Sequence, residues 1–362
     1  MVTTPRSTPP RSGSKRPLAA PASHHEGRPL APPGGTGRIA GPTRPSALSR
    51  IGLALALVTA APAAISIQNF TAATNDRFAD APGFTAAAYD WSGVGRSADG
   101  KWVTMISANV FLSARHFHPG SPGSGIGQSV LFHPGNDPSD TPVTRTIAGV
   151  QQVGGTDLWL GYLSSPVPGT IATYAISTTV LSAGSFGASA LANAPAYLSG
   201  ISPTTGSYGS YPPTNQAVGT NRVEGFQSGV TVSGLTGDVL IMVQNQPGDA
   251  GFIHTPYEAN LAGGDSGGPL MTLAAGNLVV SGIAWAIGTV DIDPGPGVTN
   301  RPATIHSYTG NYAPAIQDYI SLHAVPEPAG ATLVAMMALL GFRRRRRPVG
   351  EPAESTRFAG SE

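Results

Sequence analysis

The chain has 362 residues, a formal net charge of +1 and 40% hydrophobic residues, enough for one large all-β unit or two modest domains with a buried core. It contains no cysteine, which excludes a thiol nucleophile, a thiolate metal site and any disulfide. Residues 65–324 have seven Lys or Arg against fifteen Asp or Glu, and this acidic balance argues against a nucleic acid partner.

The first 63 residues have the features of a targeting segment. Residues 1–50 are rich in Pro, Arg, Gly and Ser and poor in large apolar side chains, so we expect a disordered leader. Residues 51–63, IGLALALVTAAPA, follow an arginine flank and end in a small-x-small pattern, which predicts the hydrophobic region and cleavage site of a signal peptide. The mature chain is then expected to start near Ala64; the alternative is a buried helix.

The body, residues 64–324, reads as β structure. Short apolar runs with β-branched residues alternate with Gly, Pro, Ser, Asn and Thr clusters, which favours an antiparallel all-β barrel or sandwich. A long surface loop is expected at 199–216, and a single helical pattern at 312–324 places Ile316 and Tyr319 on one face. The predicted strands lie in WVTMISANVFLSA, SVLFHP, RTIAGVQQV, DLWLGYL, GVTVSGL, DVLIMV and NLVVSGIAWAIG.

A candidate catalytic base ends the first of these runs. The segment FLSARHF places His116 at the end of an expected strand, where a fold can present its imidazole. His118 lies two residues on and could pair with it around a metal, but no third ligand follows at a suitable spacing, so no metal site is expected. A structural, hydrogen-bonded histidine is the alternative.

An acid that would orient the base is sought further along the chain. The candidates are Asp137, Asp140, Asp157, Asp238 and Asp249. Asp157 opens the strand-like DLWLGYL, which could hold a carboxylate in a dry setting, whereas Asp137 and Asp140 lie in the turn-like GNDPSD. Asp157 is therefore the preferred acid, with a strand-leading turn residue as the alternative.

A candidate nucleophile lies in LAGGDSGGPL, residues 261–270. Glycines on both sides of Ser266 allow a sharp turn that brings N–H groups near a reacting carbonyl without interference from Cβ atoms. A nucleophilic serine requires a base and an acid that orients the base, and His116 and Asp157 supply them.

The segments SARH, TDLWLGYL and GDSGGP resemble the three catalytic motifs of trypsin/chymotrypsin-like serine proteases, and the similarity covers about residues 75–322. The resemblance implies an all-β fold of two six-stranded antiparallel β-barrels, chymotrypsin-like, with a short C-terminal helix. The first barrel would span about 75–185, the second about 186–310, and the helix 312–324.

The resemblance also implies roles for single residues. His116 would be general base and then acid, Asp157 would orient it, and Ser266 would attack the scissile carbonyl of a protein or peptide substrate. The N–H groups of Gly264 and Ser266 would form the oxyanion hole. The family's reaction uses no metal or organic cofactor.

Several positions depart from the family. Asn260 stands where an Asp at the base of the substrate pocket selects Lys or Arg, so cleavage after a basic residue is not expected, although Glu258 could reach the pocket in another loop register. The pocket wall around Trp285, GIAWAIG, lacks the Ser that often bonds the catalytic aspartate. Asp265 would pair in the family with a new Ile or Val amino terminus; here the end near Ile65 is one candidate partner, and another group is the alternative.

The C-terminal segment 325–347 resembles a PEP-CTERM sorting signal of Gram-negative bacteria. A Pro-Glu-Pro element precedes fourteen uncharged residues, Ala329–Phe342, and five arginines. As a helix this stretch would be about 21 Å long, short of the roughly 30 Å hydrocarbon core, with the arginines at the cytoplasmic face. The resemblance implies a transmembrane helix in transient inner-membrane association, an exosortase-type processing enzyme, and export to the cell envelope, cell surface or extracellular matrix. A polar tail, 348–362, extends past the usual end.

Together these features predict an exported serine endopeptidase. The main alternative is a catalytically silent protease-like binding or matrix module displayed at the cell surface. A structural β-sandwich adhesin, in which the three motifs coincide by chance, is a further alternative.

Overall fold

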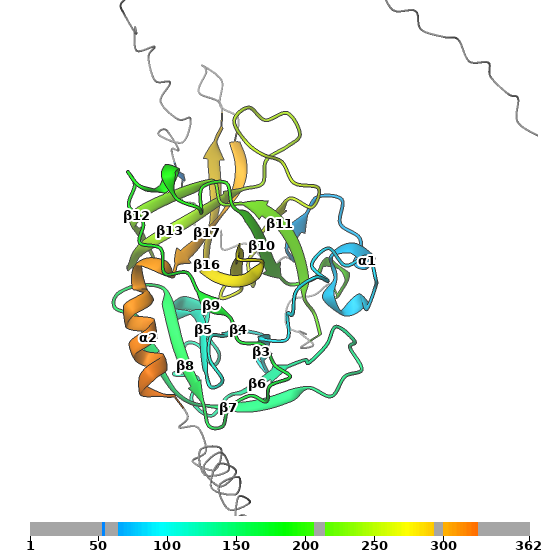
Figure 1. The fold of residues 1–362 in the computed structure, drawn as a ribbon, viewed down its shortest axis with the longest axis vertical. Coiled ribbons are helices and arrows are strands. Elements are labelled where there is room, and N and C mark those ends of the chain that lie inside the picture. Colours follow the sequence, from blue (N-terminus) through cyan, green and yellow to red (C-terminus); the bar gives the residue numbers. More distant parts are fainter. Residues whose placement is uncertain (1–52, 55–63, 206–213, 293–299, 325–362) are drawn as a thin grey trace, which may run out of the picture. The chain divides into compact units, whose positions relative to one another are not determined.

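The structure is a computed structural model that describes residues 53–54, 64–205, 214–292 and 300–324 (Figure 1). The expected leader, most of the signal segment, the sorting segment and the polar tail lie outside the described residues. The described part is mostly β, as predicted, and none of its helices has the length and apolar character needed to span a membrane.

Six antiparallel strands close into a barrel in the order β3-β4-β5-β8-β7-β6. Its interior is filled by buried apolar side chains that include Phe111, Phe132 and Ile147. Gly161 leaves room for this filling, because a Cβ there would lie 2.2 Å from the Phe111 ring. The strands are β3 (Val94–Ser97), β4 (Trp102–Met105), β5 (Val110–Ala114), β6 (Ser129–Phe132), β7 (Val143–Gln152) and β8 (Leu158–Leu163).

A second sheet has the strand order β11-β10-β15-β16-β17-β13-β12. Its main strands are β10 (Pro195–Gly200), β11 (Ala217–Arg222), β12 (Gly225–Val232), β13 (Leu235–Val243), β15 (Pro269–Ala274), β16 (Asn277–Asp291) and β17 (Asn300–Tyr308). Two short strands, β1 (Leu53–Ala54) and β9 (Ala175–Ile176), also pair with β16. Strand β1 falls inside the expected signal segment.

The second sheet differs from the closed barrel that the resemblance implied. Its ladders form an open path in the described residues, with β11 at one end and β12 at the other. The sheet is open because the chain bends between its two end strands. Only Val223 and Glu224 separate β11 from β12, and the Glu224 N–H donates to the Ile241 carbonyl at 2.9 Å. Chain continuity therefore joins the two ends of the path.

Strand β5 is buried on both faces, which explains its unbroken apolar sequence. Phe111 points into the barrel, whereas Val110 and Leu112 belong to a second core cluster that also contains Met271 and Val280 of the second sheet. This shared core holds the barrel against the second sheet.

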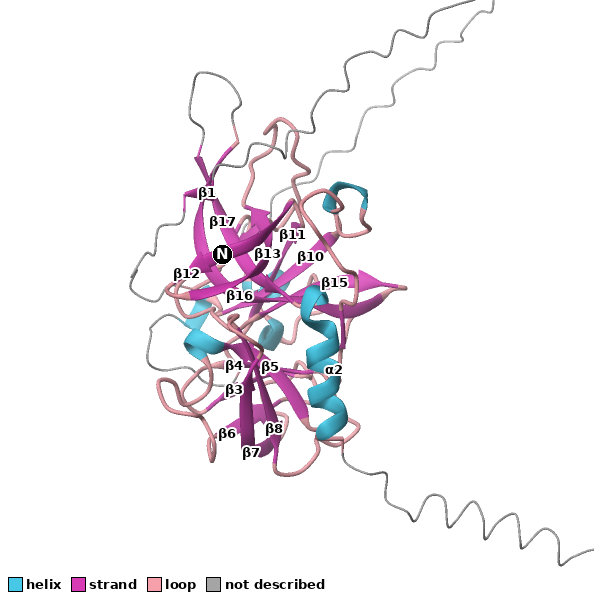
Figure 2. Cartoon of the chain, turned by 90° about the vertical axis from the view of Figure 1, so that its left-hand side faces the viewer, coloured by secondary structure: helices cyan, strands magenta, loops and turns pink. Residues whose placement is uncertain are grey.

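Helix α2 (Ala313–Leu322) confirms the predicted C-terminal helix (Figures 1 and 2). Its buried side chains, Ala313, Ile316 and Tyr319, belong to the shared core, and the His323 ring after it stacks on Tyr162 with centroids 4.0 Å apart. The remaining short elements are α1 (Ala72–Asn75), β2 (Ser66–Ile67), which pairs with β14 (Ala259–Asn260), and the 3-10 turns η2 (Arg77–Ala79), η3 (Arg115–Phe117), η4 (Phe186–Ala188), η5 (Pro203–Thr205) and η6 (Gly310–Tyr312).

Two buried carboxyl groups meet beside the bend. The Asn245 amide donates to Glu224 at 2.8 Å and to Glu258 at 3.0 Å. Burial raises the pKa of Glu224 to about 8 and that of Glu258 to about 7, against opposing hydrogen bonds from Val243 and Thr255. Both groups therefore hold protons more tightly in the folded chain than in the unfolded one.

We expect the stability of the fold to decrease as the pH rises. The contribution of these two carboxyls is complete below their unfolded pKa, near 4.5, and is lost as the pH reaches 7 to 8, with a slope of up to about 1.4 kcal/mol per pH unit for each proton. Urea unfolding from pH 5 to 8.5 measures this slope. Glu258→Gln should flatten it and the exposed Asp318→Asn should not; an unchanged slope in Glu258→Gln would contradict the assignment.

Candidate active site

The pairing of β5 with β8 brings His116 and Asp157 together. Ala114, the last residue of β5, is opposite Leu158, the first residue of β8. His116 follows β5 in the η3 turn and Asp157 precedes β8, so both lie at the same end of the ladder. The Arg115 N–H donates to the Asp157 carbonyl at 2.7 Å and extends the ladder by one bond.

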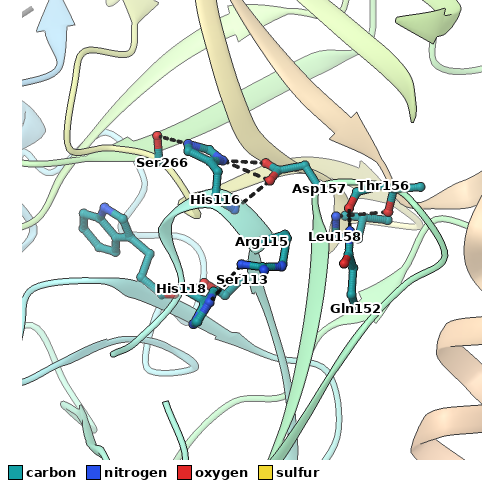
Figure 3. Close-up of polar contacts among 10 residues, drawn as sticks. Ser113, Arg115, His116, His118, Gln152, Thr156, Asp157, Leu158 and Ser266 are labelled. Atoms are coloured by element: carbon teal, nitrogen blue, oxygen red, sulfur yellow. Dashed lines mark hydrogen bonds and ion pairs between the residues drawn. The ribbon is translucent and has the colours of Figure 1, made fainter. Parts of the chain in front are cut away.

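The Asp157 carboxylate faces His116 directly (Figure 3). Its Oδ2 lies 2.8 Å and its Oδ1 3.0 Å from His116 Nδ1, and Oδ1 also accepts the His116 backbone N–H at 2.9 Å. Burial raises the pKa of Asp157, while the hydrogen bonds from His116 oppose that rise. Ala284, the residue before Trp285, has no hydroxyl to donate, and the His116 backbone N–H is the second donor that His116 gives to the carboxylate.

Ser266 lies on the other side of the imidazole. Its Oγ is 2.9 Å from His116 Nε2, and Figure 3 shows Ser266, His116 and Asp157 in one continuous line. The His116 side chain is 32% exposed and Asp157 is fully buried, so the acid is dry and the base is open to solvent. The structure thus brings together the three residues singled out in the sequence, two from the barrel and one from the loop between β14 and β15.

The glycines around Ser266 have steric reasons. Gly264 and Gly267 have φ of +100° and +88°, which favour glycine. A Cβ on Gly267 would lie 3.1 Å from Ser113 Oγ, and one on Gly268 would lie 2.6 Å from the Ser199 carbonyl oxygen. The loop therefore packs closely against both the barrel and the second sheet.

The loop's N–H groups divide into two sets. Those of Asp265, Gly267 and Gly268 donate to Ala262, Ala284 and Asp265 carbonyls at 2.9 to 3.1 Å. Across the described part of the chain, those of Gly264 and Ser266 have no protein acceptor. These two groups, which the resemblance places in an oxyanion hole, are free to bind a ligand oxygen.

The residues expected to line a substrate pocket bond to or pack against their own neighbours. Asn260 in β14 is half-buried, and its amide donates to the Leu261 carbonyl at 3.0 Å. Trp285 is 4% exposed and packs in a core cluster with Val239 and Ile305. Glu258 is fully buried and bonded inward to Thr255 and Asn245, so it does not reach a substrate pocket.

His118 and the remaining candidate acids lie apart from Ser266, His116 and Asp157. His118 is buried, and its ring stacks on Trp159 with centroids 4.3 Å apart, away from His116 Nε2. Asp238 binds Asn311 and Asp249 pairs with Arg301. In the residues that the structure describes, no group of three or more His, Cys, Asp or Glu could hold a metal ion.

Several groups that shape the site were not predicted from the sequence. Ser113 is one of them, because its hydroxyl would crowd a Cβ on Gly267 and so favours a glycine there. The same hydroxyl donates to the Trp102 carbonyl at 2.8 Å. Backbone amides of Ile201 and Ala262 bind the Asp265 carboxylate. Ser113 stands three residues before His116 in the strand and could have been noted, but backbone donors carry no signal in residue type.

A scan against protein-family models and a search of curated proteins both find no match to this chain.

We expect Gly267→Ala to destabilise the fold and to disturb Ser266. Its positive φ costs about 1 to 2 kcal/mol for any L side chain, and contact with Ser113 adds to that. Gly276→Ala is the matched control, because Gly276 has φ +81° with no atom within 4 Å of a Cβ. Urea unfolding should show a larger loss for Gly267→Ala; equal losses would show that Ser113 does not crowd this position.

Proposed function

We propose that the chain is an exported serine endopeptidase that hydrolyses peptide bonds through an acyl-enzyme intermediate. One observation carries the proposal: the Ser266 hydroxyl lies 2.9 Å from His116 Nε2 while Nδ1 of the same ring lies 2.8 Å from the buried Asp157 carboxylate. A hydroxyl, an imidazole and a dry carboxylate in this order form the constellation that makes serine nucleophilic.

The geometry fits a two-stage reaction. His116 Nε2 takes the Ser266 proton as Oγ bonds to the substrate carbonyl carbon, and the free N–H groups of Gly264 and Ser266 bind the oxygen that gains negative charge. His116 then gives the proton to the departing amine, which breaks the peptide bond and leaves an ester on Ser266. Water, deprotonated by His116, hydrolyses that ester, and Asp157 stabilises the imidazolium in both stages.

The fold supports placing the chain among trypsin/chymotrypsin-like proteases with two six-stranded barrels. The closed barrel carries His116 and Asp157. If β11 and β12 are counted as one bent strand, the strand path of the second sheet also closes on itself. That sheet then also has six main strands. The proposed protease domain is residues 64–324, with barrels at about 75–185 and 186–310.

Substrate preference is proposed from Asn260 in β14 and Trp285 in β16, which flank Ser266 in the sequence. Neither carries a negative charge, and the nearby Glu258 is turned inward, so a basic residue before the scissile bond has no acidic partner at these positions. We propose cleavage after uncharged side chains. Profiling the purified protein against a peptide library would reverse this proposal if Lys or Arg were preferred.

Export and sorting are proposed from the two ends of the chain. The signal segment 51–63 and the segment 325–347 suit secretion across the inner membrane of a Gram-negative bacterium and processing by an exosortase-type enzyme. The protein would then act in the cell envelope, at the surface or in the extracellular matrix.

We expect the purified full chain to react with a serine-directed fluorophosphonate at Ser266. The Ser266→Ala variant, which folds alike because it loses one half-buried hydroxyl, should not be labelled. Mass spectrometry of the labelled peptide identifies the site. A folded wild-type protein without labelling would favour the catalytically silent binding module.

We also expect Asp157→Asn to lower kcat by about 10³- to 10⁴-fold, because an amide cannot hold His116 in the tautomer with Nε2 free to accept a proton. The half-buried Asp137→Asn is the control, since Asp137 lies in a turn outside the site and accepts the Ser139 N–H. Steady-state hydrolysis of a fluorogenic peptide measures both variants. Equal activity of Asp157→Asn and wild type would remove Asp157 from the mechanism.

A further inference from the structure

Asp265 is a buried carboxylate held by backbone amides. It is fully inaccessible to solvent; its Oδ1 accepts the Ile201 N–H at 2.7 Å and its Oδ2 accepts the Ala262 N–H at 2.8 Å. Both oxygens are therefore satisfied. Gly200 closes the site, because a Cβ there would lie 2.8 Å from Cγ, Oδ1 and Oδ2 of Asp265.

The segment expected to become the new amino terminus lies beside this site as an internal part of the chain. The Ile65 N–H donates to the Ile201 carbonyl at 3.0 Å, and Ile65 is 1% exposed. The next two residues form β2, which pairs with Ala259 and Asn260 in β14. Ile201 thus donates to Asp265 and accepts from Ile65, and the Ile65 nitrogen is engaged by a carbonyl instead of by Asp265.

The neighbouring Ser266 is already arranged for reaction in this uncut chain. Because Asp265 lies between the two residues with free N–H groups, anchoring its carboxylate fixes the peptide planes on both sides of it. Gly264 has its φ of +100°, and Ser266 Oγ is 2.9 Å from His116. In the residues that the structure describes, the side-chain hydrogen bonds of Asp265 and Ser266 involve two backbone amides and His116, and no amino terminus takes part.

We propose that Asp265 is a positioning residue whose two backbone donors, Ile201 and Ala262, replace an amino-terminal ammonium group, so that the nucleophile loop is active before any cut near Ala64. Removal of the signal segment then serves location and not activation. The inference rests on the proposed function and adds to it that no zymogen step exists.

Opposing effects act on the charge of Asp265. Burial raises the pKa of Asp265 to about 7, whereas the amides of Ile201 and Ala262 and the positive charge of Arg96 lower it. A carboxylate accepts two N–H groups more readily than a neutral acid does, so these donors stabilise the form that holds the loop.

The first test separates cutting from activity. Residues 60–64 of the full chain are replaced by Asp-Asp-Asp-Asp-Lys, so that enteropeptidase cleavage leaves Ile65 as the amino terminus. We expect the intact protein, the cut protein and the intact wild type to react with a fluorophosphonate at rates within about twofold of each other.

Two results would overturn the inference in different ways. Inert intact chains and a gain of about 100-fold or more on cutting would show that the new amino terminus activates the loop, with the proposed function intact. Absence of labelling in every folded form would remove the protease function and the inference together.

The second test disturbs Asp265 without cutting the chain. Gly200→Ala pushes a methyl group against its carboxylate, whereas Gly187→Ala, at an exposed position of the η4 turn, meets no atom within 4 Å. We expect Gly200→Ala to lower kcat by about 10-fold or more with little change in KM, and Gly187→Ala to match the wild type.

Asp265→Asn covers the case in which Gly200→Ala does not fold. It keeps one acceptor oxygen and turns an N–H group toward one of the two amide donors, so kcat should fall while KM and the peptide preference stay unchanged. A merely structural role would lower the melting temperature without a fall in kcat at unchanged KM. Folded Asp265→Asn with wild-type kcat would overturn the positioning role.

Discussion

The hydrogen bonds between Asp157 and His116 are the constraint on which the site depends. A carboxylate without solvent contact must be satisfied by protein donors, and here one residue supplies both a ring nitrogen and a backbone N–H. This demand fixes where β5 must end and where β8 must begin. It also fixes the orientation of the imidazole, and with it the side on which Ser266 must arrive.

Ser266 reaches that position because its loop is fastened to both sheets. Gly267 donates to Ala284 in β16 and packs against Ser113 in the barrel, while Gly268 fits under the Ser199 carbonyl. A Cβ would be crowded at Gly267, and at Gly268 it would require the backbone to shift. A loop held by backbone contacts on both sides is rigid, as preorganised catalysis requires.

Much of this could be predicted from the sequence, for reasons that differ between elements. Runs such as DLWLGYL form strands because their apolar side chains fill two cores, and the motifs around His116 and Ser266 pointed to residues that meet in space. Strand β11, AVGTNR, was not predicted because its polar residues interrupt the apolar run by which the other strands were recognised. The open path of the second sheet and the donors to Asp265 were also missed, since a bend and a backbone N–H group leave no mark in residue type.

The bend at Val223 and Glu224 affects how the protein behaves at high concentration. An open sheet presents end strands whose unpaired N–H and C=O groups can recruit a strand from another molecule. Here the end strands are two halves of one turning segment, of six and eight residues, so neither offers a long straight edge. A chain without disulfides thereby gains protection against edge-to-edge aggregation from its backbone path alone.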